Sequence, residues 1–226
     1  MNWERWARAT GIGFVVLTVS AFIVGGEAPT VTDSTEDLIS YYGDRGQVLV
    51  SSLLFGIALL FLLWFAAAIG NLLRESGEGR LGATVVAAAT AFVTLQLALT
   101  GVGDSLAYSI AGQGDAGVVK ALFDLQWVLD LFAALPAAGF ILAASIGLMR
   151  ARAVPSWLSW AGIAVAALFL LRTTNWARDG FWSPTGGFVF ILIIVALLWI
   201  LTTSVVLFRK APAITVTAAL PPTPST

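Results

Sequence analysis

Long apolar runs separated by short polar segments dominate the chain. A helix needs about 20 apolar residues to cross the hydrocarbon core of a bilayer, which is ~30 Å thick. Six runs approach or exceed this length, so we expect an all-α membrane protein, a six-transmembrane-helix bundle in one membrane domain over residues 1–210. The predicted spans are residues 7–25, 48–73, 81–102, 125–149, 156–172 and 187–208.

The fourth run is too long for the membrane that it would cross. Residues 119–150 form one helical pattern of ~45 Å at ~1.5 Å per residue. Its first turns must therefore lie outside the apolar core, and they carry Asp124, Gln126 and Asp130. We expect the other helices to pack around this one, with a kink at Pro136, which lacks a backbone donor.

The first run has two interpretations. It could be a signal peptide cleaved near Gly26-Glu27-Ala28, but Pro29 directly after that site is unfavourable. Ala7, Ala9 and Thr10 extend the run to nearly spanning length, which favours a retained first span.

A short outer interfacial helix is expected between the first two spans. Ser34 and Asp37 have the spacing of a capping box, in which each side chain binds the other residue's backbone N–H. Tyr41 and Tyr42 follow within residues 36–44, and tyrosine favours the headgroup level of a membrane.

Small residues fill the first half of the third span, residues 81–102, and allow close approach of neighbouring helices. We therefore expect this helix to be central. The run Gly101-Val-Gly-Asp104 is expected to end it and to begin a glycine-rich loop. A second stripe of small residues at Gly139, Ala143 and Gly147 should serve packing of the fourth span.

Composition narrows the chemistry. The chain is 58% hydrophobic and 11% charged, where a soluble domain has about 25% charged residues. It has no cysteine and no histidine, which excludes disulfides, thiol catalysis and histidine-ligated haem or zinc. No lysine lies in the middle of a span, so a retinal Schiff base is excluded. We expect no cofactor and no resident metal, and the absence of a basic cluster with interleaved aromatics argues against nucleic acid.

The charges also predict the topology. With alternating loops and both termini in the cytoplasm, eight of the 12 basic residues face inward, as the positive-inside rule requires. The inward set is Arg5, Arg8, Arg74, Arg80, Arg150, Arg152, Arg209 and Lys210, and the outward set is Arg45, Lys120, Arg172 and Arg178. Ten of the 13 acidic residues face outward, so the outer face is acidic. Residues 211–226, rich in proline, threonine and alanine, are expected to form a disordered cytoplasmic tail.

One turn resembles a known group. Residues 150–162 read Arg-Ala-Arg-Ala-Val-Pro-Ser-Trp-Leu-Ser-Trp-Ala-Gly, similar to the R-x-R-x-[VL]-P-x-W-L-x-W-x-G turn of bacterial six-helix integral membrane proteins of unknown function. The resemblance implies a six-helix protein of the bacterial cytoplasmic membrane and implies no activity.

The candidate functional residues gather at the outer ends of the predicted spans. They are Asp104, Asp124, Gln126, Asp130, Arg172 and Arg178. Ionisable groups at such depth are usually paired inside the bundle or face a wet cavity. The set is therefore a structural ion-pair network, a ligand or ion pocket open to the outside, or a group of solvated helix ends. We expect Asp130 and Arg172 to interact directly or through Asp104.

Three functions remain open at this point. The first is a membrane protein without catalysis, acting as a small binding, sensing or accessory subunit whose partners are the lipid bilayer and a membrane protein or small ligand. The second is a small-solute transporter with an outward-facing Asp/Arg site. The third is an intramembrane hydrolase, because Gly101-Val-Gly-Asp104 matches the GxGD of aspartyl proteases of that class. In those enzymes the other catalytic aspartate precedes the GxGD motif in the chain, whereas Asp124 and Asp130 both follow Asp104.

Overall fold

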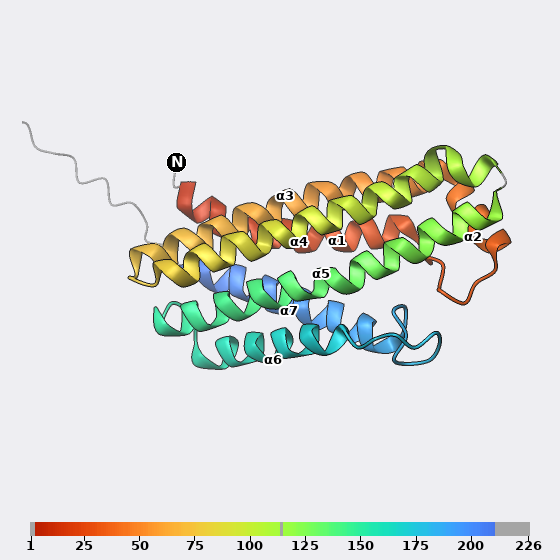
Figure 1. Ribbon diagram of the computed structural model, residues 1–226. Coiled ribbons are helices and arrows are strands. Elements are labelled where there is room, and N and C mark those ends of the chain that lie inside the picture. Colours follow the sequence, from red (N-terminus) through yellow and green to blue (C-terminus); the bar gives the residue numbers. More distant parts are fainter. Residues whose placement is uncertain (1–2, 114, 211–226) are drawn as a thin grey trace, which may run out of the picture.

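The computed structural model describes residues 3–113 and 115–210, and all regular elements within them are helices (Figure 1). The long helices run along a common axis, with α2 at one end of the molecule. The elements are α1 (Trp3–Gly25), α2 (Thr35–Gly43), α3 (Arg45–Glu75), α4 (Gly79–Ser105), the π-helical turn η1 (Leu106–Ile110), the 3₁₀ turn η2 (Ala111–Gln113), α5 (Ala116–Arg150), α6 (Ser156–Arg172) and α7 (Gly187–Lys210). The tail predicted over residues 211–226 lies outside the described residues.

Five of the helices in the described part of the chain, α1, α3, α4, α5 and α7, are long and apolar enough to cross a membrane. They indicate a membrane-embedded protein with several spans. Helix α6 is apolar but has only 17 residues, the lower limit for crossing the hydrocarbon core. A sixth span therefore remains a prediction.

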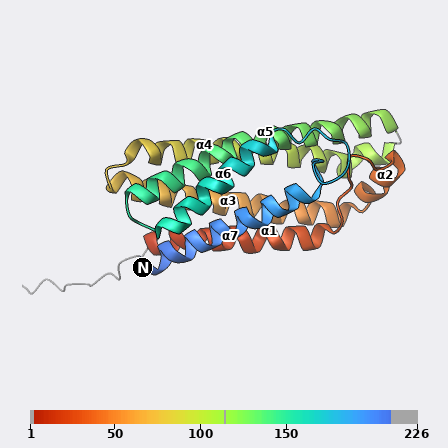
Figure 2. The same cartoon turned by 90° about the horizontal axis from the view of Figure 1, so that it is seen from below.

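The helices form a closed ring of neighbours in the order α1, α3, α4, α5, α6, α7 and back to α1. Figure 2 shows α1 and α7 side by side along one edge. The Ser204 hydroxyl of α7 donates to the Arg8 carbonyl of α1, and the Ser51 hydroxyl of α3 donates to the Ala21 carbonyl at the other end of α1. Helix α1 is thus packed along its length, which favours the retained first span over the signal peptide.

Helix α5, rather than α4, is the most buried of the long helices. In the most apolar window of each helix, 67% of α5 is buried against 28% of α4, so the expectation of a central third span is wrong. The small residues of α4 do allow close packing, and Ala88 lies against Gly139 of α5. A Cβ built on Gly82 would lie 2.6 Å from the Gly70 carbonyl oxygen of α3, which shows how closely the two backbones approach there.

Beyond the main bundle, the ends of α3, α4 and α5 extend past the α6–α7 loop and meet α2 (Figures 1 and 2). A separate apolar cluster, here called the outer cap, joins them: Leu38, Tyr42, Val48, Leu106, Ala107, Ala111, Val119 and Phe123. The capping box of Ser34 and Asp37 is present and starts α2 as predicted.

The expected glycine-rich loop after the third span is absent. Gly101 to Asp104 are helical, and α4 continues to Ser105 and then into η1 and η2. The reason lies in packing, because the Gln126 side chain of α5 fills the space beside Gly103, where a Cβ would lie 3.1 Å from its amide nitrogen. The glycine admits a neighbouring side chain instead of ending the helix.

Candidate functional site

A largely buried carboxylate joins three helices. Asp130 of α5 accepts a hydrogen bond from Gln96 Nε2 of α4 at 3.1 Å through Oδ1, and it forms an ion pair with Arg172 of α6 through Oδ2. The side chains of Asp130 and Arg172 are 17% and 7% exposed. Charge-assisted hydrogen bonds of this kind are among the strongest in proteins, and here they neutralise two charges that would be costly to bury alone.

The helices bring these residues to one depth. Asp130 precedes the end of α5 by about 20 residues, or ~30 Å, and Arg172 is the last residue of α6. A cation in the last helical turn also interacts favourably with the negative end of the helix dipole. The predicted direct contact of Asp130 with Arg172 is therefore present, and Asp104 does not bridge them.

Several polar atoms next to the ion pair make no hydrogen bond among the described residues. Arg172 Nε is buried without a hydrogen-bond partner among the described residues, as are both polar side-chain atoms of Asn175, which is 0% exposed. The Asn175 backbone N–H donates to the Arg172 carbonyl at 2.9 Å, which holds the start of the α6–α7 loop against the helix end. Buried polar groups of this type are usually satisfied by water or by a ligand.

Gln126 belongs to the outer cap rather than to the ion pair. Its Oε1 accepts a hydrogen bond of 3.2 Å from the Tyr42 hydroxyl of α2. Burial raises the pKa of the Tyr42 hydroxyl above its usual value, because the ionised form would lose solvation. This contact ties α2 to α5.

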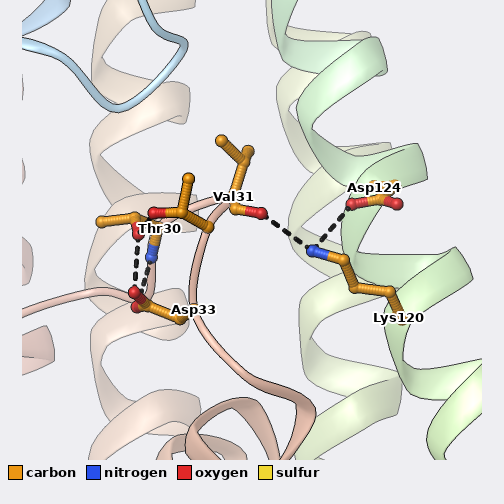
Figure 3. A network of polar contacts seen from close by, with 6 residues as sticks. Thr30, Val31, Asp33, Lys120 and Asp124 are labelled. Carbon is orange, nitrogen blue, oxygen red and sulfur yellow. Dashed lines mark hydrogen bonds and ion pairs between the residues drawn. The ribbon is translucent and has the colours of Figure 1, made fainter. Parts of the chain in front are cut away.

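Asp124 has a third environment, shown in Figure 3. It forms an i,i+4 ion pair of 3.3 Å with Lys120, whose ammonium also donates to the Val31 carbonyl at 3.0 Å. Beside Val31, the backbone N–H and the hydroxyl of Thr30 donate to Asp33, and these hydrogen bonds lower the pKa of that carboxyl group. Lys120 and Asp124 thus fasten the α1–α2 loop to α5.

The six predicted site residues therefore do not form one pocket. Asp130 and Arg172 pair in the bundle, Gln126 and Asp124 hold the outer cap and its loop, and Arg178 is exposed on the α6–α7 loop. Among the described residues, no group of three acidic side chains is placed to hold a metal ion.

Asp104 lies on a different face of α4 from Gln96, which contacts Asp130 of α5. Its neighbour Gly103 faces α5, and one residue later in a helix the direction turns by about 100°. Asp104 consequently lines a groove between α3 and α4, here called the α3–α4 groove, with a volume of about 440 Å³. The groove is lined by Leu49, Ser52, Leu53, Gly56, Ile57, Leu60, Leu97, Thr100, Gly101 and Asp104.

Sequence reasoning missed this groove and the role of Ser52. Ser52 and Gly56 are four residues apart on α3, and Gly101 and Asp104 are three apart on α4, so each pair shares a helix face. The sequence shows this spacing, but it does not show that the two helix faces meet.

Comparison with protein-family models, curated proteins and solved structures finds no match to this chain.

Proposed function

We propose that this chain is a six-span protein of the bacterial cytoplasmic membrane, with both termini in the cytoplasm, that acts without catalysis of its own as a binding, sensing or accessory subunit. The observation that carries the proposal is the engagement of Asp130. Its carboxylate is taken by Arg172 and Gln96 from within the bundle, which is the arrangement of a structural brace rather than of an open site.

The packing of α6 supports the sixth span. This helix lies between α5 and α7, which are both long enough to cross. Its N-terminal turn exposes Trp157 and Trp160, at 61% and 62%, as expected of an aromatic belt at the membrane interface. Reporter fusions at Lys210 and within the exposed turn at Gly112 test the topology, with inside and outside signals expected respectively. Reversed signals would contradict it.

Hydrolysis by an aspartate pair has little support. The two candidate partners of Asp104 are engaged elsewhere, since Asp124 binds Lys120 and Asp130 binds Arg172. Two carboxylates that share a proton must lie in direct contact. The hydrogen-bond and ion-pair contacts of the described residues include none between Asp104 and either acid.

Transport is the second candidate, and one observation favours it. The unused hydrogen-bonding groups of Arg172 and Asn175 lie at the outer end of the bundle, where a small polar solute could enter. A transporter of this kind needs a wet path from the outer face to Gln96. The accessory role instead requires that the region around Gln96, which is 7% exposed, stays sealed.

Cysteine labelling distinguishes these two functions, because the natural chain has no cysteine. A Gln96→Cys variant in intact cells should resist a membrane-impermeant maleimide and react only after unfolding in SDS. Tyr108→Cys is the matched control on the same side, and it should react at once because Tyr108 is 68% exposed. Rapid outside labelling of Gln96→Cys would contradict the proposal and favour transport.

A further inference from the structure

The α3–α4 groove exists because the two helices separate toward the outer cap. At the other end they touch at Gly70 and Gly82, where an added Cβ would collide with backbone. Near the cap the glycines face open space instead. An added Cβ on Gly101 would meet nothing within 4 Å, and one on Gly56 would meet only Leu97 at 4.0 Å.

The groove has the length of one lipid leaflet. From Leu49 to Leu60 along α3 it extends ~17 Å, about half of the ~30 Å hydrocarbon core. Its apolar walls include Leu53, Leu60 and Leu97, which are 63%, 53% and 44% exposed. A partner helix would instead require a complementary surface over the whole thickness of the membrane. The half-length trough fits an acyl chain.

The polar groups of the groove gather at its cap end. Ser52 lies within hydrogen-bonding reach of Asp104, and Asp104 Oδ1 is buried without a hydrogen-bond partner among the described residues. That oxygen is an acceptor, so the group that satisfies it must donate an N–H or O–H. An ammonium group would supply both the hydrogen bond and the opposite charge.

A cation, Arg45, begins α3 at the cap end of the molecule. Arg45 is seven residues before Ser52 and shares its helix face, and its guanidinium lies 5.5 Å from the centre of the Tyr108 ring. Tyr108 follows Asp104 by four residues, in the turn η1 that continues α4, so the Arg45–Tyr108 contact lies beyond the cap end of the groove lining. Arg45 makes no ion pair with the described residues, which leaves its charge available to a phosphate.

We infer that the α3–α4 groove is a binding site for one phospholipid with an amine headgroup, of the phosphatidylethanolamine class. Asp104 and Ser52 receive the ammonium, Arg45 faces the phosphate, and an acyl chain lies over Gly56 and Gly101. Residues 27–45 and 104–130, which surround the outer cap, carry nine acidic and two basic side chains, and this charge disfavours a lipid with a net negative headgroup. This inference requires only that the protein is membrane-embedded, and it does not depend on the accessory role.

Native mass spectrometry of the delipidated full-length chain in detergent tests the site. The probes are dioleoyl phosphatidylethanolamine and dioleoyl phosphatidylglycerol, which share their acyl chains. We expect one saturable site that prefers the amine lipid by about tenfold, the value of one charge-assisted hydrogen bond. Asp104→Asn should remove that preference, and Gly101→Leu should weaken the binding of both lipids by filling the trough.

The matched control is Ala91→Leu, an exposed position of α4 that does not line the groove, and it should bind the amine lipid like the natural chain. If Gly101→Leu fails to fold, Gly56→Leu fills the same trough from α3. Equal affinity for both lipids, or binding unchanged by Asp104→Asn, would overturn the inference. So would lipid binding unchanged by Gly101→Leu together with a change in oligomeric mass, which would show that a helix occupies the groove.

Discussion

Asp104 and Asp130 are two carboxylates near the same end of the bundle with opposite surroundings. Asp130 points into the interior and is bound by Gln96 and Arg172 from two other helices. Asp104 lines a membrane-facing groove beside Ser52, and its Oδ1 has no hydrogen-bond partner among the described residues. The same chemical group is fully paired in one place and leaves one oxygen without a partner in the other.

The difference shows how helix register decides the role of an acid in an apolar protein. Gln96 and Gly103 of α4 face α5, whereas Asp104, one residue further, is turned toward α3. Removing one partner of a buried ion pair leaves an uncompensated charge and strongly destabilises the fold. A carboxylate with an unused oxygen is a place where a ligand is expected. Their responses to substitution should therefore differ.

Asp130→Asn should have the largest effect on stability. It leaves the Arg172 charge buried without a partner, and breaking a buried pair in this way costs about 3–5 kcal/mol. Arg172→Gln should destabilise by a similar amount. Unfolding of the purified protein in mixed detergent and SDS measures both, and Arg178→Gln on the exposed loop is the matched control, expected within ~0.5 kcal/mol of the natural chain. An equal loss of stability in Arg178→Gln would show that the effect comes from removing any charge and not from breaking the Asp130–Arg172 pair.

Tyr42→Phe should have an intermediate effect. It removes the hydrogen bond to Gln126 and should cost about 1 kcal/mol. Because burial raises the pKa of Tyr42 in the folded protein, its contribution is fully present below the unfolded value of about 10 and is lost as the pH rises above it. Stability measured from pH 8 to 11 should fall less steeply in Tyr42→Phe than in the natural chain. Parallel curves would show that Tyr42 does not titrate with unfolding.

Asp104→Asn should change stability in lipid-free detergent by less than about 1 kcal/mol, because no internal cation is left unpaired by it. The main effect of Asp104→Asn is expected on the affinity for lipid. A loss as large as that of Asp130→Asn would show that Asp104 has an internal partner, and the contrast between the two acids would fail.

Asp124→Asn should have the smallest effect. Its partner Lys120 is an i,i+4 neighbour, the two side chains are 55% and 34% exposed, and such pairs contribute about 0.3–0.5 kcal/mol. Lys120 retains its bond to the Val31 carbonyl in this variant. Thermal unfolding in detergent within error of the natural chain is the expected result, and a loss above ~1 kcal/mol would give Asp124 a larger part in the outer cap.

Much of the fold follows from local pattern. The spacing of apolar residues placed most helix ends within a few residues, although α5 begins at Ala116, well before the predicted span start at residue 125, and the Ser34–Asp37 capping box marked the start of α2. The depth of Asp130 and Arg172 followed from counting residues along each helix, and this count placed them at the same level. Their contact was predictable because an isolated charge at that depth has few alternatives.

The remainder depended on tertiary packing. Gly101-Val-Gly-Asp104 was expected to form a loop because glycine weakens an isolated helix, but Gly103 is kept helical beside Gln126. The predicted outer cluster separated into several environments, since helix rotation decides which neighbour each side chain meets. The α3–α4 groove depends on the angle between two helices, and that angle cannot be read from either helix alone.

A double-mutant cycle on Asp130 and Arg172 tests the central claim, that these two charges form an internal brace. Asp130→Asn, Arg172→Gln and the double variant are compared with the natural chain by SDS unfolding. Because the double variant leaves no unpaired charge, it should lose less than the sum of the single losses, with a coupling energy of about 1–3 kcal/mol. Strict additivity would show that the two residues do not interact and would contradict the account.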